Sequence, residues 1–147
     1  MARKSSGGRP RGAGADPEAG DADGEPGKRR AGRRLYRGLA DGTVLVAVPG
    51  ATPVPLASRA DLRNHSPTGF SWGYAGSGPA QLALALACDV LGDDAEAVRL
   101  YQDLKTVFVA RLPQGRPWGP VSSDELRLEI SEAEAVRSLA AWTSGPG

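Results

Sequence analysis

The segment PAQLALALACDVLG at 79–92 constrains the fold more than any other part of the chain. Pro79 suits the first position of a helix, the Ala and Leu residues after it are strong helix formers, and Gly92 suits the end. The apolar residues surround almost the whole circumference of this helix instead of forming one stripe. The pattern predicts a helix buried in the middle of a small domain.

The first 34 residues have a different composition. Segment 1–34 contains no Val, Leu, Ile, Phe, Trp or Tyr, but eight glycines, three prolines, nine Lys/Arg and five Asp/Glu. Such a segment cannot bury enough apolar surface to offset the entropy cost of ordering it. We therefore predict a disordered basic tail at 1–34, a single domain at 35–143 and a disordered end at 144–147.

The charge is uneven, with +4 on the tail (9 basic, 5 acidic) and −3 on residues 35–147 (9 basic, 12 acidic). An acidic domain is poorly suited to nucleic acid, whereas the basic tail can make nonspecific phosphate contacts or simply keep the protein in solution. Cys88 is the only cysteine, which excludes an intramolecular disulfide and a multi-cysteine metal site and favours a reducing compartment. No apolar run is long enough to span a bilayer. We predict a cytoplasmic protein with no cofactor, no bound metal and no membrane partner.

Two β-prone runs flank Asp41-Gly42, a strong turn dipeptide, and predict a hairpin. The prolines at 49, 53 and 55 then favour an extended connector over an interior strand. After the buried helix, Asp93 is placed to cap a second helix over 94–111. Its apolar residues recur at intervals of three and four, at Val98, Tyr101, Leu104, Phe108 and Leu112.

The C-terminal part is harder to assign. Residues 114–120 have a loop composition, and ELRLEI at 125–130 alternates strictly, which predicts a strand. Ser122 and Glu125 also fit a capping box, so a short helix competes with that strand, and a last helix is expected over 132–142. The predicted fold is α+β: a small antiparallel sheet, made of the hairpin and a candidate third strand, packed on the buried helix with two further helices.

The segment that we expect to carry function is HSPTGFSWGYAGSGPAQ at 65–81, which leads into the buried helix. Free amides and the helix dipole at that helix start could receive an anion, with Ser77 or Gly78 as the cap. However, the segment matches neither a Walker loop nor a dinucleotide fingerprint. A tight structural connection into the helix is the simpler interpretation of its glycines.

The side chains of this segment allow two interpretations each. His65 titrates near neutral pH and could act as an acid or base, but a His in a turn more often bonds to a local backbone group. The alternating Phe70, Trp72 and Tyr74 could stack a base or sugar, or belong to the core. Gln81 needs polar partners in an apolar helix, and its amide hydrogen-bonds either to the glycine loop or to a ligand.

The segment from His65 to Pro113 closely resembles a small uncharacterised domain family of bacteria, archaea, phages and plasmids with the motif HSPxGFxWGYxGSGPAQLALALL. The resemblance runs from about Leu35 to Trp142. Where the family often has an acidic residue this chain has Ser71, and Ala75 stands where Gly is usual. The resemblance implies a recurring small α+β domain, often carried by mobile elements, and it assigns no catalytic role to any residue.

We therefore favour a small binding or interaction module, acting as an accessory or regulatory protein of a mobile element. Its ligand would be a small anionic molecule or a protein partner. The first alternative is an enzyme acting on a nucleotide-like or small anionic substrate through His65 and the glycine loop. The second is nonspecific nucleic-acid binding through 1–34. The candidate ligand-binding residues, all from the quoted segment, are His65, Ser66, Trp72, Tyr74, Gly76, Ser77, Gly78 and Gln81.

Overall fold

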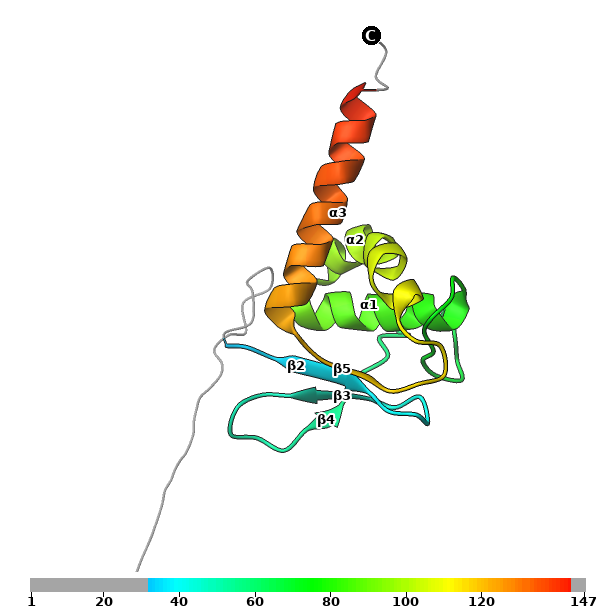
Figure 1. Cartoon of the computed structure of the whole chain (residues 1–147), viewed down its shortest axis with the longest axis vertical. Helices are drawn as coiled ribbons and strands as arrows, with labels where there is room; N and C mark the ends of the chain where they lie inside the picture. The colour runs from blue at the N-terminus through cyan, green and yellow to red at the C-terminus, as the bar shows by residue number, and fades with distance from the viewer. Residues whose placement is uncertain (1–31, 144–147) are drawn as a thin grey trace, which may run out of the picture.

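The computed structural model describes residues 32–143, and within them the fold is α+β, as predicted. Figure 1 shows a sheet on one side of the domain, helix α1 lying across it and helix α2 beyond α1. The long helix α3 runs from the sheet past both other helices. Most of the predicted tail at 1–34 and the predicted disordered end at 144–147 lie outside the described residues.

The sheet has four antiparallel strands in the order β4-β3-β2-β5. The predicted hairpin is confirmed as β2, Leu35–Gly38, and β3, Val44–Ala47. Its turn follows the predicted chemistry, because Gly42 has a φ of 92° and the Thr43 N–H donates to Asp41 Oδ1 at 2.9 Å. The proline-rich connector adds a short edge strand, β4, Val54–Pro55, where a missing N–H costs no ladder bond.

Helix α1, Ser77–Leu91, confirms the predicted buried helix and begins two residues before Pro79. Its leucines and alanines between positions 80 and 87 are at most 5% exposed, because the sheet lies on one side and the other helices on another. Gly92 ends it with a φ of 68°, a left-handed conformation that glycine adopts without strain. The core of the domain therefore forms around this one helix.

Helix α2, Asp94–Val107, is capped as expected by Asp93, whose carboxylate accepts from Ala95 N and Glu96 N. The helix ends four residues earlier than predicted, and a single turn of 3-10 helix, η2, Val109–Arg111, follows. Tyr101 and Leu104 are buried as the periodicity requires. Val98, Phe108 and Leu112 are partly buried against the same core.

Two C-terminal predictions are wrong. Residues 114–120 are not all loop, since β5, Trp118–Ser122, begins inside them and pairs with β2. Residues 125–130 are not a strand but the start of α3, Ser123–Thr143, so the helix expected from 132 begins nine residues earlier. The competing interpretation was correct: Ser122 N donates to Glu125 Oε1 at 2.8 Å and Glu125 N donates to Ser122 Oγ at 3.1 Å, a reciprocal capping box.

Strand β2 is tied to α1 by a polar cluster. The Arg34 guanidinium donates to both carboxylate oxygens of Asp89 at 2.7 and 3.0 Å, and the Tyr36 hydroxyl donates to the same carboxylate at 2.6 Å. Burial and the neighbouring carboxylate raise the pKa of Tyr36 well above its ordinary value. Arg34, which we had placed in the tail, thus already contacts the domain.

Candidate functional site

The clearest concave surface near the segment at 65–81 is a hollow of about 340 Å³ beside the turn of the β2–β3 hairpin. Consecutive residues from Phe70 to Trp72, together with Tyr74, form one wall. The hairpin turn and a second loop complete the hollow with Ala40, Asp41, Gly42, Gln114 and Gly115. Three segments far apart in the sequence therefore meet at one surface, which we call the aromatic hollow.

A second hollow of about 320 Å³ adjoins the first and shares Asp41, Gly42 and Phe70 with it. It continues toward Thr68 and Gly69 and toward the β4 edge at Pro55 and Leu56. Each volume lies at the lower end of the range found for small-molecule sites. Phe70, which is half-buried between the two hollows, is the residue that both share from the segment at 65–81.

Two backbone contacts fix the wall of the aromatic hollow. The Trp72 indole N–H donates to Arg116 O at 2.9 Å, and its ring packs edge-on against Trp118 at a centroid distance of 5.9 Å. Gly73 has a φ of 89° and donates its N–H to Val109 O at 3.0 Å. A Cβ on Gly73 would meet the Gln114 backbone at 2.5 Å, so only glycine allows the two loops this close.

The start of α1 is filled by the protein itself. The prediction that Ser77 or Gly78 caps this helix is wrong. Gly76 takes the cap position, with extended backbone and no side-chain cap bond. Gly78 and Pro79 are buried, and the Ser71 hydroxyl occupies the space that a Cβ on Gly78 would need. Ser71 Oγ and Tyr74 OH share a hydrogen bond of 2.8 Å. These contacts favour the structural interpretation of the glycine segment over an anion site.

Gln81 ties down a loop rather than lining either hollow. Its side chain is fully buried, and Oε1 accepts from His65 N at 2.7 Å and Ser66 N at 3.1 Å. Nε2 donates to Ser58 O at 2.7 Å and Arg63 O at 3.0 Å. Both donors and both acceptor positions of the amide are therefore used, by residues 58–66 and not by the glycine loop.

His65 makes its side-chain contact with α2. Its Nε2 lies 2.7 Å from the Tyr101 hydroxyl, and the two rings are 5.6 Å apart. His65 is not among the residues that line either hollow. The simpler of the two interpretations, a bond from the ring to a local backbone group, does not describe this contact, because the partner is the side chain of Tyr101, 36 residues away.

The predicted site residues therefore fall into three groups. Trp72 and Tyr74 both line the aromatic hollow, but Trp72 is 3% exposed and belongs to the core, whereas Tyr74 is 41% exposed. Gly76, Ser77 and Gly78 form the start of α1. In the third group, the backbone N–H groups of His65 and Ser66 donate to the Gln81 side chain.

Sequence reasoning missed the contribution of Asp41 and Gln114 to the hollow. Asp41-Gly42 was assigned only to a turn, and nothing in a single sequence indicates that this turn lies beside Phe70. Gln114 stands in a loop of ordinary composition. A long-range contact of this kind has no local sequence signal, because it depends on how the sheet packs on the helices.

The electrostatics of the two hollows are set by one carboxylate. Of the residues that line them, all within the described part of the chain, Asp41 alone carries a formal charge at neutral pH. The backbone N–H of Thr43 donates to this carboxylate and lowers the pKa of Asp41. The hollow therefore presents the exposed Tyr74 ring, the partly buried Phe70 ring, hydroxyl and amide groups and a negative charge.

Over residues 32–143, no group of three or more His, Cys, Asp and Glu side chains is placed to hold a metal ion. None of the helices described there combines the length and apolar character needed to cross a bilayer.

Comparison with known proteins places the domain. Residues 31–132 match a family described as a family of unknown function (DUF6166). No curated protein and no solved structure matches the chain. The match covers the whole sheet, α1, α2 and the first half of α3, more than half of the chain, and so the protein belongs to this family of unknown function.

Proposed function

We propose that this protein is a small binding module whose site is the aromatic hollow and the adjoining hollow beside Phe70. The observation that carries the proposal is the meeting of Phe70, Trp72 and Tyr74 with Asp41 and Gln114 around one concave surface. Tyr74 is 41% exposed although it is aromatic, so its ring is available to a ligand. An exposed aromatic face beside polar groups suits a flat ring with hydroxyl or amide substituents.

The charge of the site indicates which ligands to expect. The Asp41 carboxylate would repel a phosphate or carboxylate, and the lining side chains supply no Lys or Arg to offset it. We therefore expect a neutral polar ring, such as a sugar or nucleoside, rather than the small anion considered from the sequence. The Ser71 and Tyr74 hydroxyls and the Gln114 amide can exchange hydrogen bonds with such a ligand.

An enzyme is the weaker alternative. The group best suited to proton transfer at neutral pH is His65, whose ring bonds to Tyr101 and does not line either hollow. A cytoplasmic location and a role as an accessory protein of a mobile element remain part of the proposal. The first rests on the single cysteine and the second on the resemblance of the motif at 65–81.

Ligand-observed NMR tests the proposal directly. A panel of neutral sugars and nucleosides is compared with the matching sugar phosphates and nucleotides, using the full chain. We expect saturation transfer from the protein to at least one neutral ring compound, and weaker transfer to its phosphorylated form. Tighter binding of the phosphorylated forms would refute the charge argument.

Two variants locate the site. Ala40→Trp fills the aromatic hollow from its exposed rim and should abolish the transfer, whereas Ser77→Trp adds the same ring at an exposed position that lines neither hollow. Equal transfer to the two variants would show that the ligand binds elsewhere. Asp41→Asn should raise the affinity for phosphorylated ligands, because it removes the negative charge.

A further inference from the structure

Helix α3 carries an apolar stripe on the side that faces away from the domain. Leu126 and Ile130 are buried against the core, whereas Leu128, which is 58% exposed, points the opposite way. Ala135 and Trp142 follow Leu128 at intervals of seven residues, about two turns, so the three lie along one line of the helix. Leu139 lies beside that line and is 62% exposed, and Trp142 is 79% exposed. We call these four residues the α3 stripe.

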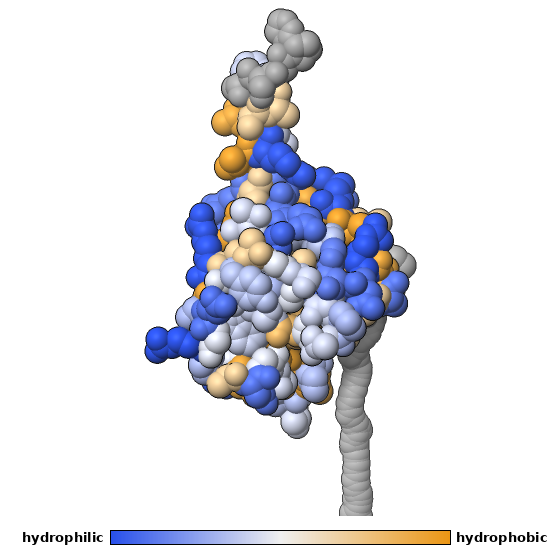
Figure 2. All heavy atoms as spheres, turned by 90° about the vertical axis from the view of Figure 1, so that its right-hand side faces the viewer, coloured by the Kyte–Doolittle hydropathy of each residue, from blue (hydrophilic) through white to orange (hydrophobic). Residues whose placement is uncertain are grey.

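The stripe extends beyond the body of the domain. Glu134 pairs with Arg99 at 2.9 Å and Arg137 with Asp103 at 3.1 Å, which fastens α3 to α2. Past this point the helix projects from the body, and Figure 2 shows apolar side chains gathered on the projection. Ala135, Leu139 and Trp142 lie after the residues that match the family model, 31–132. Large exposed apolar surfaces usually mark an interaction site.

The spacing of the stripe makes it self-complementary. If two copies of α3 lie antiparallel with Ala135 facing Ala135, then Leu128 of each copy faces Trp142 of the other, since both stand seven residues from the centre. The small alanine side chain lets the two helices approach closely where they face each other. A two-fold interface requires this kind of reciprocal match.

The charges of α3 favour the antiparallel arrangement. The first half of the helix carries Asp124, Glu125, Glu129 and Glu132 against Arg127. The second half carries Glu134 and Arg137, both paired with α2. A parallel pair would place the two acidic halves beside each other, whereas an antiparallel pair places each acidic half beside a neutral one. These charges therefore favour the antiparallel direction for a second copy of the chain.

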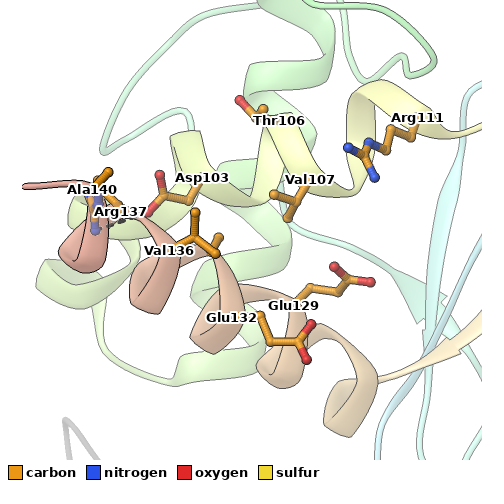
Figure 3. A pocket seen from close by; sticks show the side chains of 10 residues that line it. Asp103, Thr106, Val107, Arg111, Glu129, Glu132, Val136, Arg137 and Ala140 are labelled. Carbon is orange, nitrogen blue, oxygen red and sulfur yellow. Dashed lines mark ion pairs between the residues drawn. The ribbon is translucent and has the colours of Figure 1, made fainter. Parts of the chain in front are cut away.

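A groove beside the stripe offers room for the tryptophan. It lies between α2 and α3, has a volume of about 400 Å³, and is lined by Val107 of α2 and by Glu129, Glu132 and Val136 of α3 (Figure 3). Glu129 follows Leu128 directly, so this end of the groove lies next to the position opposite Trp142 in the antiparallel pair. Asp103, Arg111 and Arg137 also line the groove. An indole ring has an apolar body and one N–H donor, which suits the valine side chains and the carboxylates of this groove.

We propose that the protein forms a two-fold dimer through antiparallel pairing of the α3 stripes, with Trp142 of each copy seated on the partner's Leu128 and the adjoining groove. A helix of 21 residues is about 31 Å long, and the stripe is one helix wide. The interface therefore buries on the order of 600–1,000 Å² in total, below the size of a standard stable interface. We expect a reversible dimer with a dissociation constant in the micromolar range.

Sedimentation of the full chain between about 5 µM and about 500 µM measures the association. Leu139→Glu should weaken it at least tenfold, because position 139 faces positions 131 and 132 of the partner, and Glu132 is acidic. Leu139→Lys should weaken it less, since the lysine meets that carboxylate with the opposite charge. Val54→Glu is the matched control, because Val54 is similarly exposed, at 54%, but lies on β4.

Disulfide trapping tests the direction and register. In a Cys88→Ala background, Ala135→Cys should form a disulfide-linked dimer on mild oxidation, because the two residues face each other at the centre. Leu128→Cys should not, because its two copies lie about 21 Å apart in the antiparallel pair, far beyond disulfide reach.

Four outcomes would overturn the proposal: a monomer over the whole concentration range, cross-linking through Leu128→Cys, dissociation by Val54→Glu with no effect of Leu139→Glu, or equal weakening by Leu139→Glu and Leu139→Lys.

Discussion

Replacing Gln81 with leucine should remove the strongest local constraint on the segment that precedes the aromatic residues. The Gln81 amide is fully buried and makes four hydrogen bonds of 2.7–3.1 Å to backbone groups of Ser58, Arg63, His65 and Ser66. Each such bond contributes about 1 kcal/mol net. Leucine fills a similar volume and recovers part of this by its apolar burial. We therefore expect the free energy of unfolding to fall by about 3 kcal/mol.

Urea denaturation measures this loss. With an m-value of about 1.5 kcal/mol/M, a loss of about 3 kcal/mol moves the midpoint down by about 2 M. Gln102→Leu is the control, because Gln102 is an exposed glutamine of α2, and its replacement should change stability by no more than about 0.5 kcal/mol. Amide hydrogen exchange should also accelerate at His65 and Ser66, the two donors to Gln81. A loss below about 1 kcal/mol for Gln81→Leu would refute the assignment of Gln81 as the anchor of residues 58–66.

Two further predictions follow from other buried groups. Burial raises the pKa of the Cys88 thiol to about 11, so the folded state favours the neutral thiol. The stability that this preference contributes is fully present below the ordinary thiol pKa of about 8.5 and is lost as the pH rises toward 11. The free energy of unfolding should therefore fall between about pH 8.5 and 11, and less steeply in Cys88→Ala; identical pH profiles for the two proteins would contradict this. Ser122→Ala removes one half of the capping box at the start of α3 and should cost about 1 kcal/mol in urea denaturation, whereas Ser138→Ala on the exposed part of the helix should cost little.

Several elements were predictable because their signals are local. The all-round apolar pattern at 79–92 identified α1, Asp41-Gly42 identified the hairpin turn, and Asp93 identified the start of α2. Each depends on neighbouring residues, whose conformational preferences act within one or two turns of backbone. These parts could therefore be read before any tertiary contact was known.

The errors at 114–130 have a tertiary cause. Leu126, Leu128 and Ile130 alternate as in a strand, but Leu126 and Ile130 are also four residues apart, and those two are buried while Leu128 faces solvent. The alternation therefore fitted a strand as well as a helix. The capping box and the packing of α3 on α2 stabilise the helix. Strand β5 was missed because Gly119 and Pro120 disfavour strands, although both are tolerated at a sheet edge beside β2.

The sequence by itself determined a buried central helix, a hairpin, a second helix and a segment at 65–81 rich in residues that could carry function. The tertiary structure alone decided how the polar and aromatic groups of that segment are used. Gln81 hydrogen-bonds to residues 58–66, and His65 contacts Tyr101. Trp72 and Tyr74 line a hollow together with Asp41 and Gln114. The reason is physical: secondary structure depends on preferences of nearby residues, while a binding surface depends on distances between segments that only packing brings together.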